Sequence, residues 1–214
     1  MVSDFDGTIT EKDFYLLIAE KYMGPNAMAI WDEYRAGRLT HIEAMQSFFS
    51  HAPSNELELA SMLQQTGLDP KFRESVEMLQ AAEWDLIIVS AGSSWYIDRL
   101  LASAGVEAPV HSNPGVIESG RGLVLQSNRG SRFYSEDVGV DKSAVVRDAL
   151  QNYERVAFAG DGPPDLPPAL LVDPDLRFAR GFLAEELQRL GQSFRSFRHW
   201  SEVAMACAGV LQRE

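Results

Sequence analysis

The stretch WDLIIVSAG, residues 84–92, is a continuous apolar run that ends in three small residues. A run of this kind is typical of a strand that is buried on both faces of a parallel sheet. The stretch ERVAFAGDG, residues 154–162, has the same character, and helical patterns follow the two runs at residues 93–105 and 164–172. Strands that alternate with helices predict an α/β fold with a doubly wound, mostly parallel sheet.

The first strand must be very short, because only Met1 to Ser3 precede the polar segment DFDGT at residues 4–8. Either neighbouring strands anchor it, or the natural chain starts a few residues earlier. Helical patterns then follow at residues 13–24, 26–37, 40–52, 54–67 and 69–82. We therefore predict an α/β core made of residues 1–13 and 69–214, with an all-helical insertion at residues 14–68.

Several helix ends and further elements are also predicted. Thr40 and Glu43 form a capping-box pattern, and Asp69 with Pro70 resembles an N-cap followed by a first helical residue. Short strands are predicted at residues 109–117 and 122–128 and an edge-like strand at 176–181, with helices at 141–153, 185–192 and 199–213.

Composition excludes several classes of partner. The chain is 45% hydrophobic and 23% charged, as is usual for a globular protein, and it has no apolar run near the roughly 20 residues of a membrane span. We therefore expect a cytoplasmic protein. The net charge of -12 argues against nucleic acid and anionic membranes as partners. The single cysteine, Cys207, has no internal disulfide partner.

Polar residues stand where the predicted strands end. Each group alone has an ordinary explanation, because Asp and Gly form turns, serine caps helices, and a lone lysine is usually solvated. The groups are Asp4 and Asp6, then Ser90 with Ala91 and Gly92, then Lys142, then Asp161 and Asp165.

Together these groups form a pattern with a chemical use. One carboxylate can attack phosphorus, while a second protonates the leaving oxygen and then activates water. Mg²⁺ bound by carboxylate oxygens offsets the repulsion between the anions, and a serine, backbone N–H groups and a lysine hold the phosphoryl oxygens.

The segments DFDGT, VSAG, DKS and GDGPPD resemble the four signature motifs of the haloacid dehalogenase superfamily of phosphatases and phosphotransferases. The resemblance covers nearly the whole chain and implies a Rossmann-like sheet. It also implies that Asp4 is a nucleophile that forms an aspartyl-phosphate and that Asp6 is the general acid and base. The other implied roles are phosphate binding by Thr8, Ser90, Ala91, Gly92 and Lys142, Mg²⁺ binding by Asp4, Asp161 and the backbone carbonyl of Asp6, and orientation of the metal site or of Lys142 by Asp165.

The helical insertion resembles the mobile cap of the phosphoserine-phosphatase-like branch. Within that branch, DFDGTIT and FARGFL are most similar to the phosphatases of methionine salvage. Asp13 falls where these relatives carry an acidic residue that faces the substrate. Gln46 stands where phosphoserine phosphatases use an arginine for the substrate carboxylate, which argues against phosphoserine.

The leading hypothesis is a Mg²⁺-dependent phosphomonoester hydrolase that acts on a small phosphorylated metabolite. A phosphotransferase or mutase on the same fold is the first alternative. A phosphoacceptor signalling module is an alternative of another class, since its acidic pocket and lysine also surround one aspartate. Turnover separates them, because a receiver accepts one phosphoryl group whereas an enzyme releases many.

Overall fold

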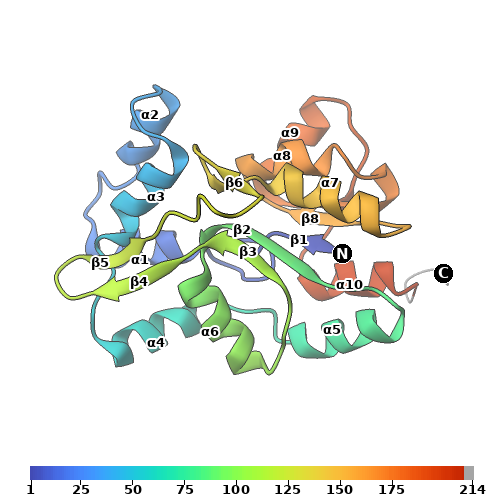
Figure 1. Cartoon of the computed structure of the whole chain (residues 1–214), viewed down its shortest axis with the longest axis horizontal. Helices are drawn as coiled ribbons and strands as arrows, with labels where there is room; N and C mark the ends of the chain where they lie inside the picture. The colour runs from blue at the N-terminus through green and yellow to red at the C-terminus, as the bar shows by residue number, and fades with distance from the viewer. Residues whose placement is uncertain (210–214) are drawn as a thin grey trace.

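Six short strands form one parallel sheet at the centre of the computed structural model, which describes residues 1–209 (Figure 1). Their order across the sheet is β10-β9-β8-β1-β2-β3. The strands are β1 (Val2–Ser3), β2 (Ile87–Ser93), β3 (Val110–Asn113), β8 (Phe158–Gly160), β9 (Arg177–Ala179) and β10 (Arg195–Ser196).

The strand β1 has only two residues, yet it lies in the interior of the sheet, because its neighbours on both sides anchor it. Val2 of β1 pairs with Ile87 of β2 on one side and with Phe158 of β8 on the other. Successive residues of a strand point to opposite faces. Accordingly Ile88 and Val89, which are both fully buried, belong to different hydrophobic clusters above and below the sheet.

Helices cover both faces of the sheet, as a doubly wound fold requires (Figure 1). One face carries α5 (Phe72–Ala81), α6 (Ser94–Ala104) and α10 (Trp200–Cys207), and the other carries α7 (Lys142–Asn152), α8 (Leu166–Ala169) and α9 (Gly181–Arg189). The predicted fold class is confirmed.

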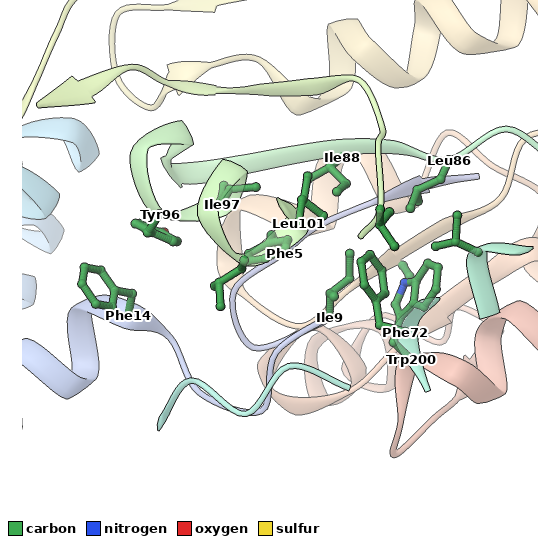
Figure 2. Close-up of a cluster of buried hydrophobic side chains, with 14 of the residues drawn as sticks. Phe5, Ile9, Phe14, Phe72, Leu86, Ile88, Tyr96, Ile97, Leu101 and Trp200 are labelled. Atoms are coloured by element: carbon green, nitrogen blue, oxygen red, sulfur yellow. The ribbon is translucent and has the colours of Figure 1, made fainter. Parts of the chain in front are cut away.

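The larger hydrophobic cluster extends from the sheet to the helical insertion (Figure 2). At one end Trp200 stacks edge-on against Phe72, with ring centroids 5.2 Å apart, and its indole N–H donates to the hydroxyl of Ser3. At the other end Phe14 lies beside Tyr96, with centroids 4.7 Å apart. The cluster therefore links the sheet, α6 and the first helix of the insertion.

The insertion contains four helices: α1 (Phe14–Tyr22), α2 (Ala29–Arg35), α3 (His41–Phe49) and α4 (Glu56–Gln65). The predicted capping box at Thr40 and Glu43 is present at the start of α3. The hairpin of β4 (Gly115–Glu118) and β5 (Gly122–Leu125) packs against α3. The two connections to the sheet run side by side, since Thr10 forms a β-bridge with Leu68.

Several details differ from the sequence-based expectations. The strand β9 is not an edge, because β10 pairs with it, and a ribbon of β6 (Tyr134–Ser135) and β7 (Gly139–Val140) was not predicted. Two 3₁₀ turns are also present: η1 (Pro163–Asp165) and η2 (Pro174–Leu176). Strands of two residues carry too little periodicity to be read from sequence.

The helix predicted to begin at Pro70 begins at Phe72 instead. The Asp69 carboxylate accepts a bond from the Lys71 N–H with one oxygen and from the Ser201 N–H with the other, so it stabilises a turn and the start of α10. Residues 210–213 of the predicted C-terminal helix lie outside the described residues. Within residues 1–209, no helix combines the length and apolarity needed to cross a membrane.

Candidate active site

The sheet brings the predicted polar groups to one edge. Asp4 and Asp6 follow β1, Ser90 lies in β2, Asp161 follows β8, and Lys142 is the first residue of α7. All five line a cavity of about 680 Å³ between the sheet and the helical insertion. A second hollow of about 740 Å³, between α5 and α6, contains none of the predicted site residues.

Asp4 is buried beside the lysine. Its Oδ1 accepts a bond of 2.6 Å from Lys142 Nζ, and the same Nζ donates to Asp165 Oδ1 at 2.6 Å. Burial raises the pKa of Asp4 and the Asp165 carboxylate raises it further, whereas Lys142 lowers it. Burial lowers the pKa of Lys142, but the two carboxylates outweigh that effect and the net shift is upward. Lys142 is therefore a fixed cation between two anions.

Asp6 is held by three donors. Tyr96 donates to its Oδ2 at 2.5 Å, Ser90 donates to the same oxygen at 3.2 Å, and the Phe14 N–H donates to Oδ1 at 3.2 Å. Burial raises the pKa of Asp6, and these hydrogen bonds partly offset the rise. A carboxyl group with a raised pKa, oriented by fixed donors, is suited to general acid and base chemistry.

Asp165 acts as a support for its neighbours. Its Oδ2 accepts bonds from the N–H groups of Asp161 and Gly162, at 3.0 and 2.9 Å, while Oδ1 faces Lys142. Both oxygens are therefore already engaged.

A divalent cation fits the acidic cluster. One carboxylate oxygen each from Asp4, Asp161 and Asp165 lie within 4.8 Å of one another. Burial raises the pKa of Asp161 to about 7, and Asp165 and Asp13 add to the rise. Lys142 alone does not compensate these charges, and hard oxygen ligands of this kind suit Mg²⁺. Since the Asp165 oxygens are engaged, Asp4 and Asp161 are the better ligand candidates.

A glycine leaves room beside this cluster. Gly7 has a positive φ of 67°, which favours glycine, and an added Cβ would collide with the Asp161 carboxylate and lie 2.7 Å from Asp13 Oδ1. The backbone of the segment DFDGT therefore lies too close to the acidic residues for a side chain at position 7.

The remaining predicted residues are placed as follows. Ala91, Gly92 and Asp13 line the cavity. Burial raises the pKa of Asp13 to about 8, with contributions from Asp6 and Asp4. The Thr8 hydroxyl donates to Asp161 Oδ1 at 2.7 Å and lies 3.3 Å from Asp4 Oδ2, so it contacts the carboxylates.

Gln46 is not brought together with these residues. Its amide nitrogen donates to the Leu123 carbonyl at 3.0 Å, and its amide oxygen accepts from the Leu125 N–H at 2.7 Å. Gln46 is absent from the cavity lining. These contacts tie α3 to β5, which is a packing role.

Three residues that contact the site were not among the predicted site residues, although Tyr96 was a candidate for lining the pocket. Tyr96 reaches Asp6 from the first turn of α6, although an aromatic residue there has the same pattern as a core residue. Arg180 donates to the carbonyls of Gly7 and Thr10, at 2.6 and 2.7 Å, and so fixes the loop after β1. Asn113 donates to the Ala91 carbonyl at 2.8 Å. The only sequence signal for Arg180 was its place in FARGFL.

One protein family and several known proteins match most of this chain. A family model described as haloacid dehalogenase-like hydrolase matches residues 1–169. A 2-hydroxy-3-keto-5-methylthiopentenyl-1-phosphate phosphatase of Brevibacillus brevis is 27% identical over 214 residues, covering 98% of this chain and 95% of that protein. A protein of the same name from Bacillus cereus is 24% identical over 211 residues, with the same coverage.

Solved structures share the fold. A HAD family hydrolase of Salmonella enterica serovar Typhi superposes with a TM-score of 0.72 at 17% identity, over 97% of this chain and 69% of that one. A substrate-bound phosphoserine phosphatase superposes with a TM-score of 0.66 at 13% identity, over 94% of each chain. At these identities the superpositions concern the fold alone.

Proposed function

We propose that this chain, which belongs to the haloacid dehalogenase-like hydrolase family and is a phosphatase, hydrolyses small phosphomonoesters. The reaction in this proposal passes through an aspartyl-phosphate on Asp4. The observation that carries the proposal is the placement of Asp4 and Asp6 on one cavity, with Lys142 2.6 Å from the first and Tyr96 2.5 Å from the second. One carboxylate is paired with a cation, and the other has a donor that orients it.

In the first step, an oxygen of Asp4 bonds to phosphorus as the bond from phosphorus to the ester oxygen breaks. Asp6 gives its proton to that oxygen, so the alcohol leaves in neutral form. Lys142 keeps one N–H bond for the phosphoryl oxygens, because Asp4 and Asp165 engage the other two. In this proposal the Ser90 hydroxyl and the Gly92 N–H exchange their acceptors, Asp6 Oδ2 and Ser90 Oγ, for phosphoryl oxygens.

In the second step, water attacks the aspartyl-phosphate. Asp6, now a carboxylate, takes a proton from the water as the new bond to phosphorus forms, and the bond from phosphorus to Asp4 breaks. Inorganic phosphate leaves, and both carboxyl groups return to their starting states. The buried position of Asp4 limits bulk water near the intermediate.

The ligands for Mg²⁺ in this proposal are the carboxylates of Asp4 and Asp161 and the backbone carbonyl of Asp6. When bound, Mg²⁺ supplies positive charge that lets these anions coexist with the phosphoryl group. Asp165 keeps Lys142 and the loop of Asp161 in place.

The substrate is a small metabolite in this proposal, and residues 14–68 form a cap over the site. The cavity lies between that insertion and the sheet, which supports a substrate small enough to be enclosed. The relatives named for 2-hydroxy-3-keto-5-methylthiopentenyl-1-phosphate make that ester the first compound to test.

The test compares wild-type protein with Asp4→Asn in phosphate release from 4-nitrophenyl phosphate with Mg²⁺. We expect at least a 10³-fold loss, because an amide cannot replace the nucleophile. Asp98→Asn, at an exposed carboxylate of α6, is the matched control and should keep full activity. Chelation of Mg²⁺ should stop turnover reversibly.

Near-normal turnover by the Asp4→Asn variant, with its thermal unfolding unchanged, would refute the nucleophile assignment. Release of only one equivalent of phosphate per protein by wild type would favour the phosphoacceptor module. Transfer of the phosphoryl group to an added sugar in preference to water would favour the mutase.

A further inference from the structure

The cavity has two unlike halves. The half on the sheet carries the charged groups described above. The opposite half is formed by the helical insertion, and its side chains are mainly aromatic. We call Tyr15 of α1, Trp31 and Tyr34 of α2, and His41 of α3 the aromatic wall; all four line the cavity.

The rings of the aromatic wall contact one another. Trp31 is central, with ring centroids 5.5 Å from Tyr15, 5.9 Å from Tyr34 and 5.3 Å from His41. Tyr34 and His41 meet edge to face at 5.6 Å. Such packed rings present a large apolar area with little freedom left to lose on binding.

One fully buried polar atom in the wall has no hydrogen-bond partner. His41 is 7% exposed, and its Nδ1 is buried without a hydrogen bond. Burial lowers the pKa of His41 to about 4, helped by Lys142, so the ring is neutral near pH 7. A buried unpaired nitrogen costs free energy, and a ligand that bonds to it recovers that cost.

The charges around the wall disfavour an anionic ligand. The Asp137 carboxylate lines the cavity and opposes an anion, whereas Asp13, whose pKa burial raises to about 8, is neutral near pH 7. Arg35 lines the cavity too, but its guanidinium is already paired with Asp32.

A contact between the sheet side and the insertion holds the wall over the site. The His41 N–H donates to Asp137 Oδ1 at 2.9 Å, and the Ile42 N–H donates to the Asp137 carbonyl at 2.8 Å. The start of α3 is therefore anchored to the loop between β6 and β7.

From these observations we infer that the aromatic wall binds the leaving group of the substrate, and that this group is uncharged and apolar with an oxygen that hydrogen-bonds to the His41 imidazole. The inference rests on the proposed phosphomonoester hydrolysis and names its substrate class. An amino-acid leaving group does not match the wall, because the Asp137 carboxylate opposes its carboxylate and the Arg35 guanidinium is already paired.

The first experiment measures kcat/KM for ethyl, propyl, butyl and pentyl phosphate with Mg²⁺. Their leaving alcohols have similar acidity, so the four esters differ in the length of the alkyl chain and not in the reactivity of the bond that breaks. Each buried methylene is expected to raise kcat/KM about fourfold, which gives about 60-fold from ethyl to pentyl.

The variant Trp31→Ala should lower the ratio of kcat/KM for pentyl phosphate to kcat/KM for ethyl phosphate at least about tenfold, because it removes the central ring of the wall. Tyr34→Leu is a second variant, in case Trp31→Ala unfolds the insertion, and should also lower the ratio. The matched control is Leu57→Ala on α4, where Leu57 is 83% exposed and away from the cavity; it should keep the wild-type ratio.

The second experiment tests His41 with pentyl and 2-oxopentyl phosphate. The preference is the ratio of kcat/KM for 2-oxopentyl phosphate to kcat/KM for pentyl phosphate. In His41→Phe this ratio should fall about tenfold relative to wild type, and His41→Gln should restore part of it. An unchanged ratio in His41→Phe would refute the inferred hydrogen bond between the leaving group and His41.

The outcomes separate this inference from the proposed function. If no monoester, including ethyl phosphate, is hydrolysed, the proposed function fails. The inference alone is overturned if ethyl phosphate is hydrolysed but kcat/KM does not rise with the length of the alkyl chain. It is also overturned if kcat/KM for phosphoserine or phosphocholine is higher than for pentyl phosphate.

Discussion

The bond between Tyr96 and Asp6 offers a specific test of the acid and base role. The Tyr96 hydroxyl donates to Asp6 Oδ2 at 2.5 Å, and the side chain is 1% exposed. Burial and the Asp6 carboxylate raise the pKa of Tyr96, so the hydroxyl keeps its proton. In Tyr96→Phe the ring retains its packing against Phe14, and only the hydroxyl is lost.

The expected loss follows from the charge on the acceptor. A hydrogen bond to a charged group contributes about 1.5–3 kcal/mol. The bond strengthens as Asp6 gives up its proton, and if half of that charge has developed in the transition state, the barrier rises by about 0.75–1.5 kcal/mol. Phosphoryl transfer to Asp4 should therefore slow about 4- to 13-fold.

The assay compares kcat/KM for an alkyl phosphate and for 2,4-dinitrophenyl phosphate. An alkoxide needs a proton to leave, whereas dinitrophenolate leaves without one. The predicted loss should therefore be seen with the alkyl ester and should be less than about twofold with the aryl ester. Trp95→Phe is the control, because Trp95 neighbours Tyr96 in α6 but has no bond to Asp6.

Equal losses on both esters would refute this reasoning, since they would indicate a general distortion of the site. No loss on either ester would show that Ser90 and the Phe14 N–H are sufficient to orient Asp6.

Three further changes test other contacts. Gly7→Ala places a Cβ against the Asp161 carboxylate at φ 67°, so we expect at least about 1–2 kcal/mol of destabilisation and weaker activation in a Mg²⁺ titration. The pKa of His41 is depressed to about 4 in the folded state against an ordinary 6.5, so its contribution to stability is present above pH 6.5 and is lost as the pH falls. Urea unfolding should show about 2 kcal/mol less stability at pH 5 than at pH 7 from this residue, and His41→Phe should remove that part. Gln46→Ala removes two bonds to β5 and should cost about 1–3 kcal/mol in urea unfolding, while the relative kcat/KM values of different substrates stay unchanged.

Local signals predicted most helices and the class of the fold. The capping box at Thr40 formed as expected, since both partners lie within four residues of chain. Gly105 ends α6 with a left-handed φ of 64°. The apolar runs that became β2 and β8 were recognisable because strands buried on both faces are apolar throughout.

Other local signals were ambiguous. Asp69 has an N-cap pattern, yet its carboxylate also accepts from Ser201, which is far away in sequence. The strands β6, β7 and β10 have two residues each, so their pairing depends on the partners that the fold supplies.

Patterns in the sequence predicted which chemical groups gather at the site. The carboxylates of Asp4, Asp6 and Asp161 stand directly after apolar strands, and in a parallel sheet those strand ends meet at one edge, near Ser90 of β2 and Lys142 of α7. The contacts that each side chain makes became known from the folded structure. It placed Tyr96 on Asp6, engaged both oxygens of Asp165, turned Gln46 toward β5 and set an aromatic wall opposite the carboxylates. Most of these contacts join residues from separate elements, and no local periodicity encodes which side chains will face each other across the folded core.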